Sequence, residues 1–149
     1  MFKSILCPVD FSPHAERALG YALDLATLTG AHLTIMTAVD PFLDAASAAA
    51  GHSEELMRQT QEEVQALLAR IGGARGQPSE APGIAVLTGN AADEILAQIA
   101  ECNADVVVMG TQGLEGAKRM VFGSTTERVL RESPVPVLAV PVPDNSRVK

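Results

Sequence analysis

Five short apolar runs that alternate with helix-forming segments constrain the fold of this chain more than any other feature of its sequence. The runs occupy residues 4–9, 31–39, 84–88, 105–109 and 136–142. Short apolar runs bounded by Gly, Pro, Asn or Asp are typical of buried strands. Strands that alternate with helices form a parallel sheet with helices packed on both faces. The sequence therefore predicts an α/β fold with an open, doubly wound parallel sheet.

Capping residues mark the helix boundaries between these runs. Ser12, Asn90 and Ser124 each stand where a helix should begin, because short polar side chains accept hydrogen bonds from the free N–H groups of a first helical turn. A further helix is expected to start at Ser53-Glu54-Glu55, where acidic residues lie at the positive end of the helix dipole. A proline follows Ser12 at the helix position that favours it, and Ser124 forms a capping box with Glu127. The first, second and last of these helices are expected to end at Gly30, at Gly72-Gly73 and at Ser133-Pro134.

Two segments are expected to lack regular structure. Residues 40–53 are rich in alanine but show no apolar face that could pack, so a loop is predicted there. Residues 74–83 are rich in Gly, Pro and Ser and are predicted to be a flexible connector.

A chain of 149 residues is expected to form one domain, spanning 1–149.

The composition argues against several classes of protein. There are 18 acidic residues against 11 basic ones, a formal net charge of −7, and nucleic-acid binding depends on a basic surface that this chain lacks. No apolar run approaches the length of a membrane span, and the N-terminal apolar stretch is too short for a signal peptide. Cys7 and Cys102 are expected to be buried thiols. We therefore expect a cytoplasmic protein.

The segment after the fourth predicted strand is rich in glycine. Met109 ends that strand, and Gly110, Gly113, Gly123 and Ser124 follow before the last helix. Glycines let a backbone approach a ligand closely and adopt positive φ. Exposed N–H groups and a helix N-terminus attract anions. The second polar strand end is Val9-Asp10, and ligands of open parallel sheets bind where the strand order reverses.

The spacing of these glycines supports an anion site without identifying the ligand. It is neither a Walker P-loop nor a dinucleotide-binding fingerprint, because the required residues do not follow at the right positions. The glycines could also serve only as a turn between strand and helix, and Ser124 could serve only as a helix cap. Asp10 could serve only in an Asx turn before Ser12.

Three segments together resemble one family. The pattern Gly, two residues, Gly, nine residues, Gly-Ser at Gly110, Gly113, Gly123 and Ser124 is similar to the ATP-binding signature of the universal stress protein family. Residues 5–12 resemble the first strand of that family and its aspartate, and residues 133–138 resemble its last strand. The resemblance covers essentially the whole chain. It implies a five-stranded sheet of order 3-2-1-4-5 and ATP as ligand, possibly with Mg²⁺.

The resemblance also implies the residues of the site. Asp10 would contact the ribose, the Val39 backbone would meet the adenine, and the glycine-rich segment would hold the phosphates. The full expected set is Pro8, Val9, Asp10, Val39, Met109, Gly110, Gly113, Gly123, Ser124 and Thr125. Leu114-Glu115 departs from the basic residue that many relatives carry after the second glycine. A carboxylate there would repel phosphate, and Lys118 and Arg119 could offset it.

Three functions remain open at this point. The first is an ATP-binding stress-response protein that works as a nucleotide-dependent switch or sensor. The second is a slow ATP hydrolase or a nucleotidyl or phosphoryl transferase, although no catalytic residue stands out. The third is an interaction protein without a nucleotide. His14, His32 and His52 are scattered, so no metal site is expected.

The last strand is expected to lie at an edge of the sheet. Relatives pair it across a two-fold axis, so the resemblance implies a homodimer through Val137, Leu138, Ala139 and Val140. The alternative is a monomer whose edge is blunted by the prolines at 136, 141 and 143.

Overall fold

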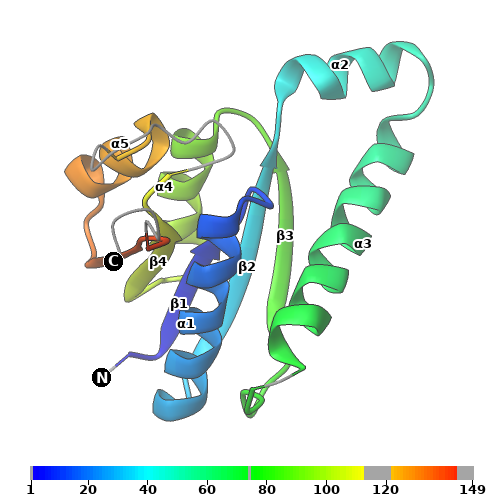
Figure 1. The fold of residues 1–149 in the computed structure, drawn as a ribbon. Coiled ribbons are helices and arrows are strands. Elements are labelled where there is room, and N and C mark those ends of the chain that lie inside the picture. The colour runs from blue at the N-terminus through cyan, green and yellow to red at the C-terminus, as the bar shows by residue number, and fades with distance from the viewer. Residues whose placement is uncertain (1, 74, 113–121, 144–149) are drawn as a thin grey trace.

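A five-stranded parallel sheet forms the centre of the molecule, with helices on both faces (Figure 1). The computed structural model describes residues 2–73, 75–112 and 122–143. The elements in chain order are β1 (Ser4–Pro8), α1 (Pro13–Thr29), β2 (His32–Val39), α2 (Pro41–Ala49), α3 (Ser53–Gly72), β3 (Gly83–Thr88), α4 (Ala91–Glu101), β4 (Val106–Gly110), α5 (Ser124–Glu132) and β5 (Val137–Val140).

The strand order is β3-β2-β1-β4-β5, which confirms the predicted topology. β1 lies between β2 and β4, with Ile5 in register with Leu33 on one side and Val106 on the other. The chain therefore winds outward in one direction through β2 and β3, then returns to the other side of β1. This reversal between β1 and β4 is where a doubly wound sheet leaves a crevice at its carboxyl edge.

Two apolar cores lie on the two faces of the sheet. Ile5 and Cys7 of β1 point to the face covered by α1 and α3, where Leu19 is fully buried. Leu6 points to the opposite face, against Ile95 of α4 and residues of α5. Alternate residues of one strand thus enter different cores, because successive strand side chains point to opposite faces. Complete burial raises the pKa of the Cys7 thiol to about 12.

Two of the three predicted N-caps, Ser12 and Asn90, are confirmed, and α3 begins at Ser53 as expected. The Ser12 hydroxyl accepts a hydrogen bond from the Ala15 N–H (3.2 Å), and α1 ends at Gly30 in the left-handed region (φ 73°). The Asn90 side chain accepts from the Asp93 N–H (3.1 Å) at the start of α4. At α5 the prediction was wrong by one residue. Gly123 is the N-cap, and Ser124 is the first helical residue.

The prediction of a loop at residues 40–53 was also wrong, because α2 forms there. Asp40 caps α2 by accepting from the Phe42 N–H (2.7 Å), and a proline begins the helix. The residues that follow are mostly alanine, the residue type with the highest helix propensity. Gly51 adopts a positive φ (79°) just after the helix end. No residue of α2 is buried. Local signals alone therefore account for this helix.

The segment between α3 and β3 is irregular, as expected. Its described residues, 75–82, include Arg75, whose guanidinium pairs with Asp24 of α1 (2.5 Å). This ion pair holds the start of the segment against α1.

None of the helices in the described ranges is long and apolar enough to cross a membrane.

Candidate functional site

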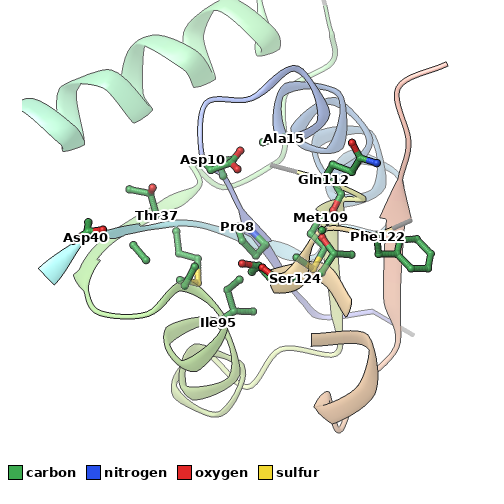
Figure 2. Close-up of a pocket in the computed structure, with 18 residues that line it drawn as sticks. Pro8, Asp10, Ala15, Thr37, Asp40, Ile95, Met109, Gln112, Phe122 and Ser124 are labelled. Carbon is green, nitrogen blue, oxygen red and sulfur yellow. Dashed lines mark hydrogen bonds between the residues drawn. The ribbon is translucent and has the colours of Figure 1, made fainter. Parts of the chain in front are cut away.

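A cavity of about 630 Å³ opens at the carboxyl ends of β1, β2 and β4, where the strand order reverses (Figure 2). Its wall contains most of the residues that the sequence predicted for the site. These are Pro8, Val9, Asp10, Met109, Gly110, Gly123, Ser124 and Thr125. Segments that are far apart in the sequence, around residues 8–10, 109–112 and 122–126, are thus brought to one cavity.

The other two predicted residues are Gly113 and Val39. Gly113 lies outside the described residues, as do Glu115, Lys118 and Arg119. Val39 does not line the cavity, and its carbonyl oxygen accepts a hydrogen bond from the Gly89 N–H (3.1 Å). The neighbouring residues Thr37, Ala38 and Asp40 line the cavity instead.

The N-terminus of α5 forms one wall of the cavity. Gly123 has no side chain to cap the first turn, so no side chain covers the N–H groups of Ser124 and Thr125 from that position. Two hydrogen bonds fix this end of the helix to the end of β4. The Gly123 N–H donates to the Thr111 carbonyl (2.9 Å), and the buried Thr126 hydroxyl donates to the Gly110 carbonyl (2.8 Å). A helix end held in this way is suited to bind an anion.

Gly110 has a role that the sequence did not reveal. It does not adopt a positive φ, contrary to the prediction, since among the described glycines only Gly30, Gly51 and Gly89 do. A Cβ at Gly110 would lie 2.6 Å from the Cβ of His14 and 2.8 Å from its carbonyl carbon. The glycine is therefore needed because α1 begins in close contact with β4. The Thr111 hydroxyl and His14 Nδ1, 3.1 Å apart, add a hydrogen bond at the same contact.

Asp10 forms the predicted Asx turn and also lines the cavity. Its Oδ1 accepts from the N–H and the hydroxyl of Ser12 at 3.1 and 2.5 Å, which is the predicted Asx turn. Phe11 between them has φ 65°, a region that non-glycine residues rarely adopt. The turn holds the Asp10 carboxylate at the cavity wall (Figure 2). Oδ1 serves the turn, and no described residue forms a hydrogen bond with Oδ2.

The wall opposite Asp10 is largely apolar. Met36 and Ala38 of β2, Ala91 and Ile95 of α4, and Met109 of β4 contribute to it. Sequence reasoning missed the residues of β2 and α4. The strand order carried a usable signal, since β2 lies beside β1 and its carboxyl end must reach the same edge. The contribution of α4 depends on packing, which no local pattern predicts. Ala15, Gln112, Phe122 and Thr126 were missed for the same reason.

The described residues give the cavity an acidic wall. Asp10 and Asp40 line it, and no described lining residue is Lys or Arg. Any attraction for an anion from the described wall therefore comes from backbone N–H groups. Within the described ranges, no three His, Cys, Asp or Glu residues are grouped so that they could hold a metal ion.

Residues 1–141 match the model of the universal stress protein family. The chain belongs to this family. One curated relative, a universal stress protein of Thermus aquaticus encoded in the QAH/OAS sulfhydrylase 3′ region, is 34% identical over 140 residues, which cover 94% of this chain and 99% of the relative.

Solved structures resemble the fold closely. A structure of protein MJ0577, a universal stress protein of Methanocaldococcus jannaschii, has a TM-score of 0.78 and 26% sequence identity, and the match covers 97% of this chain and 99% of that chain. A universal stress protein in complex with cAMP has a TM-score of 0.67 and 24% identity, covering 93% and 96% of the two chains. At that identity the second likeness concerns the fold alone.

Proposed function

We propose that this universal stress protein binds ATP in the cavity between β1 and β4 and acts as a nucleotide-dependent switch in the stress response. One observation carries the proposal. The uncapped N-terminus of α5 and the carboxylate of Asp10 face one cavity at the reversal of the strand order. Anion-binding N–H groups, a hydroxyl-binding carboxylate and an apolar wall are the groups that a nucleotide requires.

The chemistry of the wall suggests an orientation for the nucleotide. The phosphates would lie at the N–H groups of Ser124 and Thr125, which no N-cap side chain covers, whereas the Gly123 N–H already donates to the Thr111 carbonyl. The ribose would meet Asp10. The base would lie on the apolar side formed by Met36, Ala38 and Ile95. A volume of about 630 Å³ is within the ordinary range for small-ligand sites. Mg²⁺ would neutralise the phosphates while retaining several of its waters.

The switch part of the proposal rests on the connections of the phosphate end. The Gly123 N–H donates a hydrogen bond to the Thr111 carbonyl, and the Thr111 N–H donates to the Val140 carbonyl of β5 (3.1 Å). Phosphate binding at the N-terminus of α5, next to Gly123, would therefore act through Thr111 on the edge strand. A nucleotide could in this way change the surface that β5 presents to a partner.

We also propose that the protein forms a homodimer through β5. This strand lies at the edge of the sheet, paired on one side with β4. Leu138 is 44% exposed there. An apolar edge strand favours pairing with another strand, and a second copy would supply one across a two-fold axis.

Two measurements test nucleotide binding. Mass spectrometry of the small molecules released by denaturing freshly purified protein should detect ATP. The melting temperature should also rise by several °C in ATP at 100-fold above its Kd, since such binding adds about 2.7 kcal/mol of stability. Failure of millimolar ATP to change the melting temperature would contradict the proposal.

A pair of variants ties the binding to the cavity. Gly123→Val adds bulk over the α5 N-terminus without backbone strain, because Gly123 has an ordinary φ of −60°. Together with Ser124→Ala it should weaken ATP binding at least about tenfold, the loss expected for one or two hydrogen bonds to a charged group. Ser53→Ala is the matched control, since Ser53 is also the first residue of a helix but lies outside the cavity wall. It should bind ATP as the unmodified protein does.

A further inference from the structure

Thr37, near the end of β2, carries a buried polar group that the fold leaves without a partner. The residue is 5% exposed and lines the cavity. Among the described residues, none forms a hydrogen bond with its hydroxyl. No fully covered side-chain nitrogen or oxygen in the same ranges lacks a partner. The Thr37 hydroxyl oxygen is therefore not fully covered, and it opens into the cavity.

Sheet register places Thr37 alongside the residue that precedes Asp10. Pro8 of β1 is in register with Met36 of β2, and the Val9 N–H donates to the Met36 carbonyl (2.8 Å). Thr37 thus lies alongside Val9, one residue before Asp10, on a strand about 4.8 Å away. Figure 2 shows Thr37 and Asp10 on the same side of the cavity, with Ile95 on the other.

The two groups are complementary to a pair of neighbouring hydroxyls. The Asp10 carboxylate uses Oδ1 in its turn with Ser12 and can accept a hydroxyl proton through Oδ2. The Thr37 hydroxyl can both donate and accept. A ribose presents two adjacent hydroxyls, whereas a 2′-deoxyribose presents one. The face of the base can pack against the apolar wall around Ile95, so Asp10 and Thr37 are not needed to hold the base.

From this pairing we propose that Thr37 is a specificity-determining residue, which with Asp10 selects a ribonucleotide over a 2′-deoxyribonucleotide. The inference rests on the proposed function, because it concerns the same cavity. Its physical basis is an asymmetry. A site built to bond a hydroxyl discriminates strongly against an analogue that lacks it, since the buried polar group is then left unpaired.

Isothermal titration calorimetry with ATP and 2′-deoxy-ATP tests this role. The unmodified protein should bind ATP about tenfold or more tightly than 2′-deoxy-ATP. Thr37→Val keeps the shape and the strand preference of the side chain but removes the hydroxyl. It should weaken ATP binding about tenfold, the effect of one hydrogen bond, and change 2′-deoxy-ATP binding by less than about twofold. Thr37→Ser, which restores a hydroxyl, should recover the preference for ATP.

A matched control separates specificity from folding. Thr34 lies on the same strand, is 8% exposed and does not line the cavity. Thr34→Val should leave both affinities unchanged. Equal weakening of both nucleotides by Thr37→Val, or no preference in the unmodified protein, would overturn the inference while leaving the proposed function intact. Binding of neither nucleotide to the unmodified protein would instead contradict the proposed function and the inference with it.

Discussion

At Gly110 the requirement for glycine comes from packing between α1 and β4. A Cβ there would approach His14 to 2.6 Å at its Cβ and 2.8 Å at its carbonyl carbon. Backbone atoms cannot move aside as a flexible side chain can, so the first turn of α1 must shift. Because α1 follows the turn that holds Asp10, the packing at Gly110 also supports the site.

Gly110→Ala should therefore lower the free energy of unfolding by about 1–3 kcal/mol, the usual cost of overpacking. Urea denaturation followed by circular dichroism measures it. Gly72→Ala is the control, because the added Cβ would meet only Leu23 Cδ1 at 3.8 Å. It lies in the last turn of α3 and should be neutral or stabilise by up to about 1 kcal/mol. Equal stability of the Gly110 variant and the unmodified protein would contradict the contact with His14.

Asp105, at the other end of the sheet, is expected to make the free energy of unfolding depend on pH. Its carboxylate accepts from the N–H groups of Lys3 (2.6 Å) and Ser4 (2.9 Å), and these bonds lower the pKa of Asp105. A carboxyl whose pKa is lowered by folding stabilises the folded state fully above its unfolded pKa. That contribution is lost as the pH falls through the folded value.

Stability of the unmodified protein should consequently decline below about pH 4, the ordinary aspartate pKa. Asp105→Asn should be less stable at pH 7 and should lose less on acidification, because the titrating group is gone. The comparison is made by urea denaturation between neutral pH and the acid range. Glu101→Gln, which removes an exposed carboxyl on the preceding helix, serves as control. Parallel stability curves for Asp105→Asn and the unmodified protein would contradict the role of these hydrogen bonds.

Among the described helices, α2 differs from the others in its packing. It contains no buried residue, and Phe42 is 86% exposed. Figure 1 shows α2 beyond the carboxyl edge of the sheet, joined to α3. Its first residues follow directly from β2 and Asp40, which lines the cavity. The helix is thus formed by local capping and propensity, and tertiary packing contributes little to it.

Replacement of Phe42 should show this directly. Phe42→Ser should change the free energy of unfolding by less than about 0.5 kcal/mol, as exposed substitutions usually do. Leu19→Ala in the core of α1 should cost about 2–5 kcal/mol. Both are measured by chemical denaturation. A loss above about 1 kcal/mol for Phe42→Ser would mean that α2 packs against another part of the protein.

The elements differ in how far the sequence could predict them. β1, β4 and the starts of α1 and α4 were predicted because their signals are local: apolar runs, Ser12 and Asn90 as caps, and Gly30 as a helix end. α2 was missed because it lacks an apolar face, which was wrongly taken as a requirement for a helix. The cap of α5 was displaced by one residue because Ser124 is a favoured cap type, whereas Gly123 occupies that position.

The site was predictable in part for the same reason. Pro8, Val9, Asp10, Met109 and the residues around Gly123 belong to two segments with recognisable patterns. Thr37, Ile95 and the contact between Gly110 and His14 depend on which strands and helices become neighbours. No spacing of residues along the sequence predicts such contacts.

For the whole molecule, the proposed homodimer depends on the edge strand β5. Leu138→Lys places a charge on an edge strand, which opposes pairing with a second copy. Sedimentation velocity should show a dimer for the unmodified protein at micromolar concentration and a monomer for this variant. Leu28→Lys, at an equally apolar but unrelated exposed position, should remain dimeric. The same sedimentation for the unmodified protein and for Leu138→Lys would contradict a dimer through β5.

The central claim concerns the cavity at the reversal of the sheet, and an NMR titration with ATP tests it most directly. In ¹H–¹⁵N correlation spectra, the amides of Val9, Gly110, Gly123, Ser124 and Thr125 should shift most. These shifts should saturate together at submillimolar Kd, since one site binds one nucleotide. Spectra unchanged by millimolar ATP, or shifts confined to α3 and residues 75–82, would contradict the account.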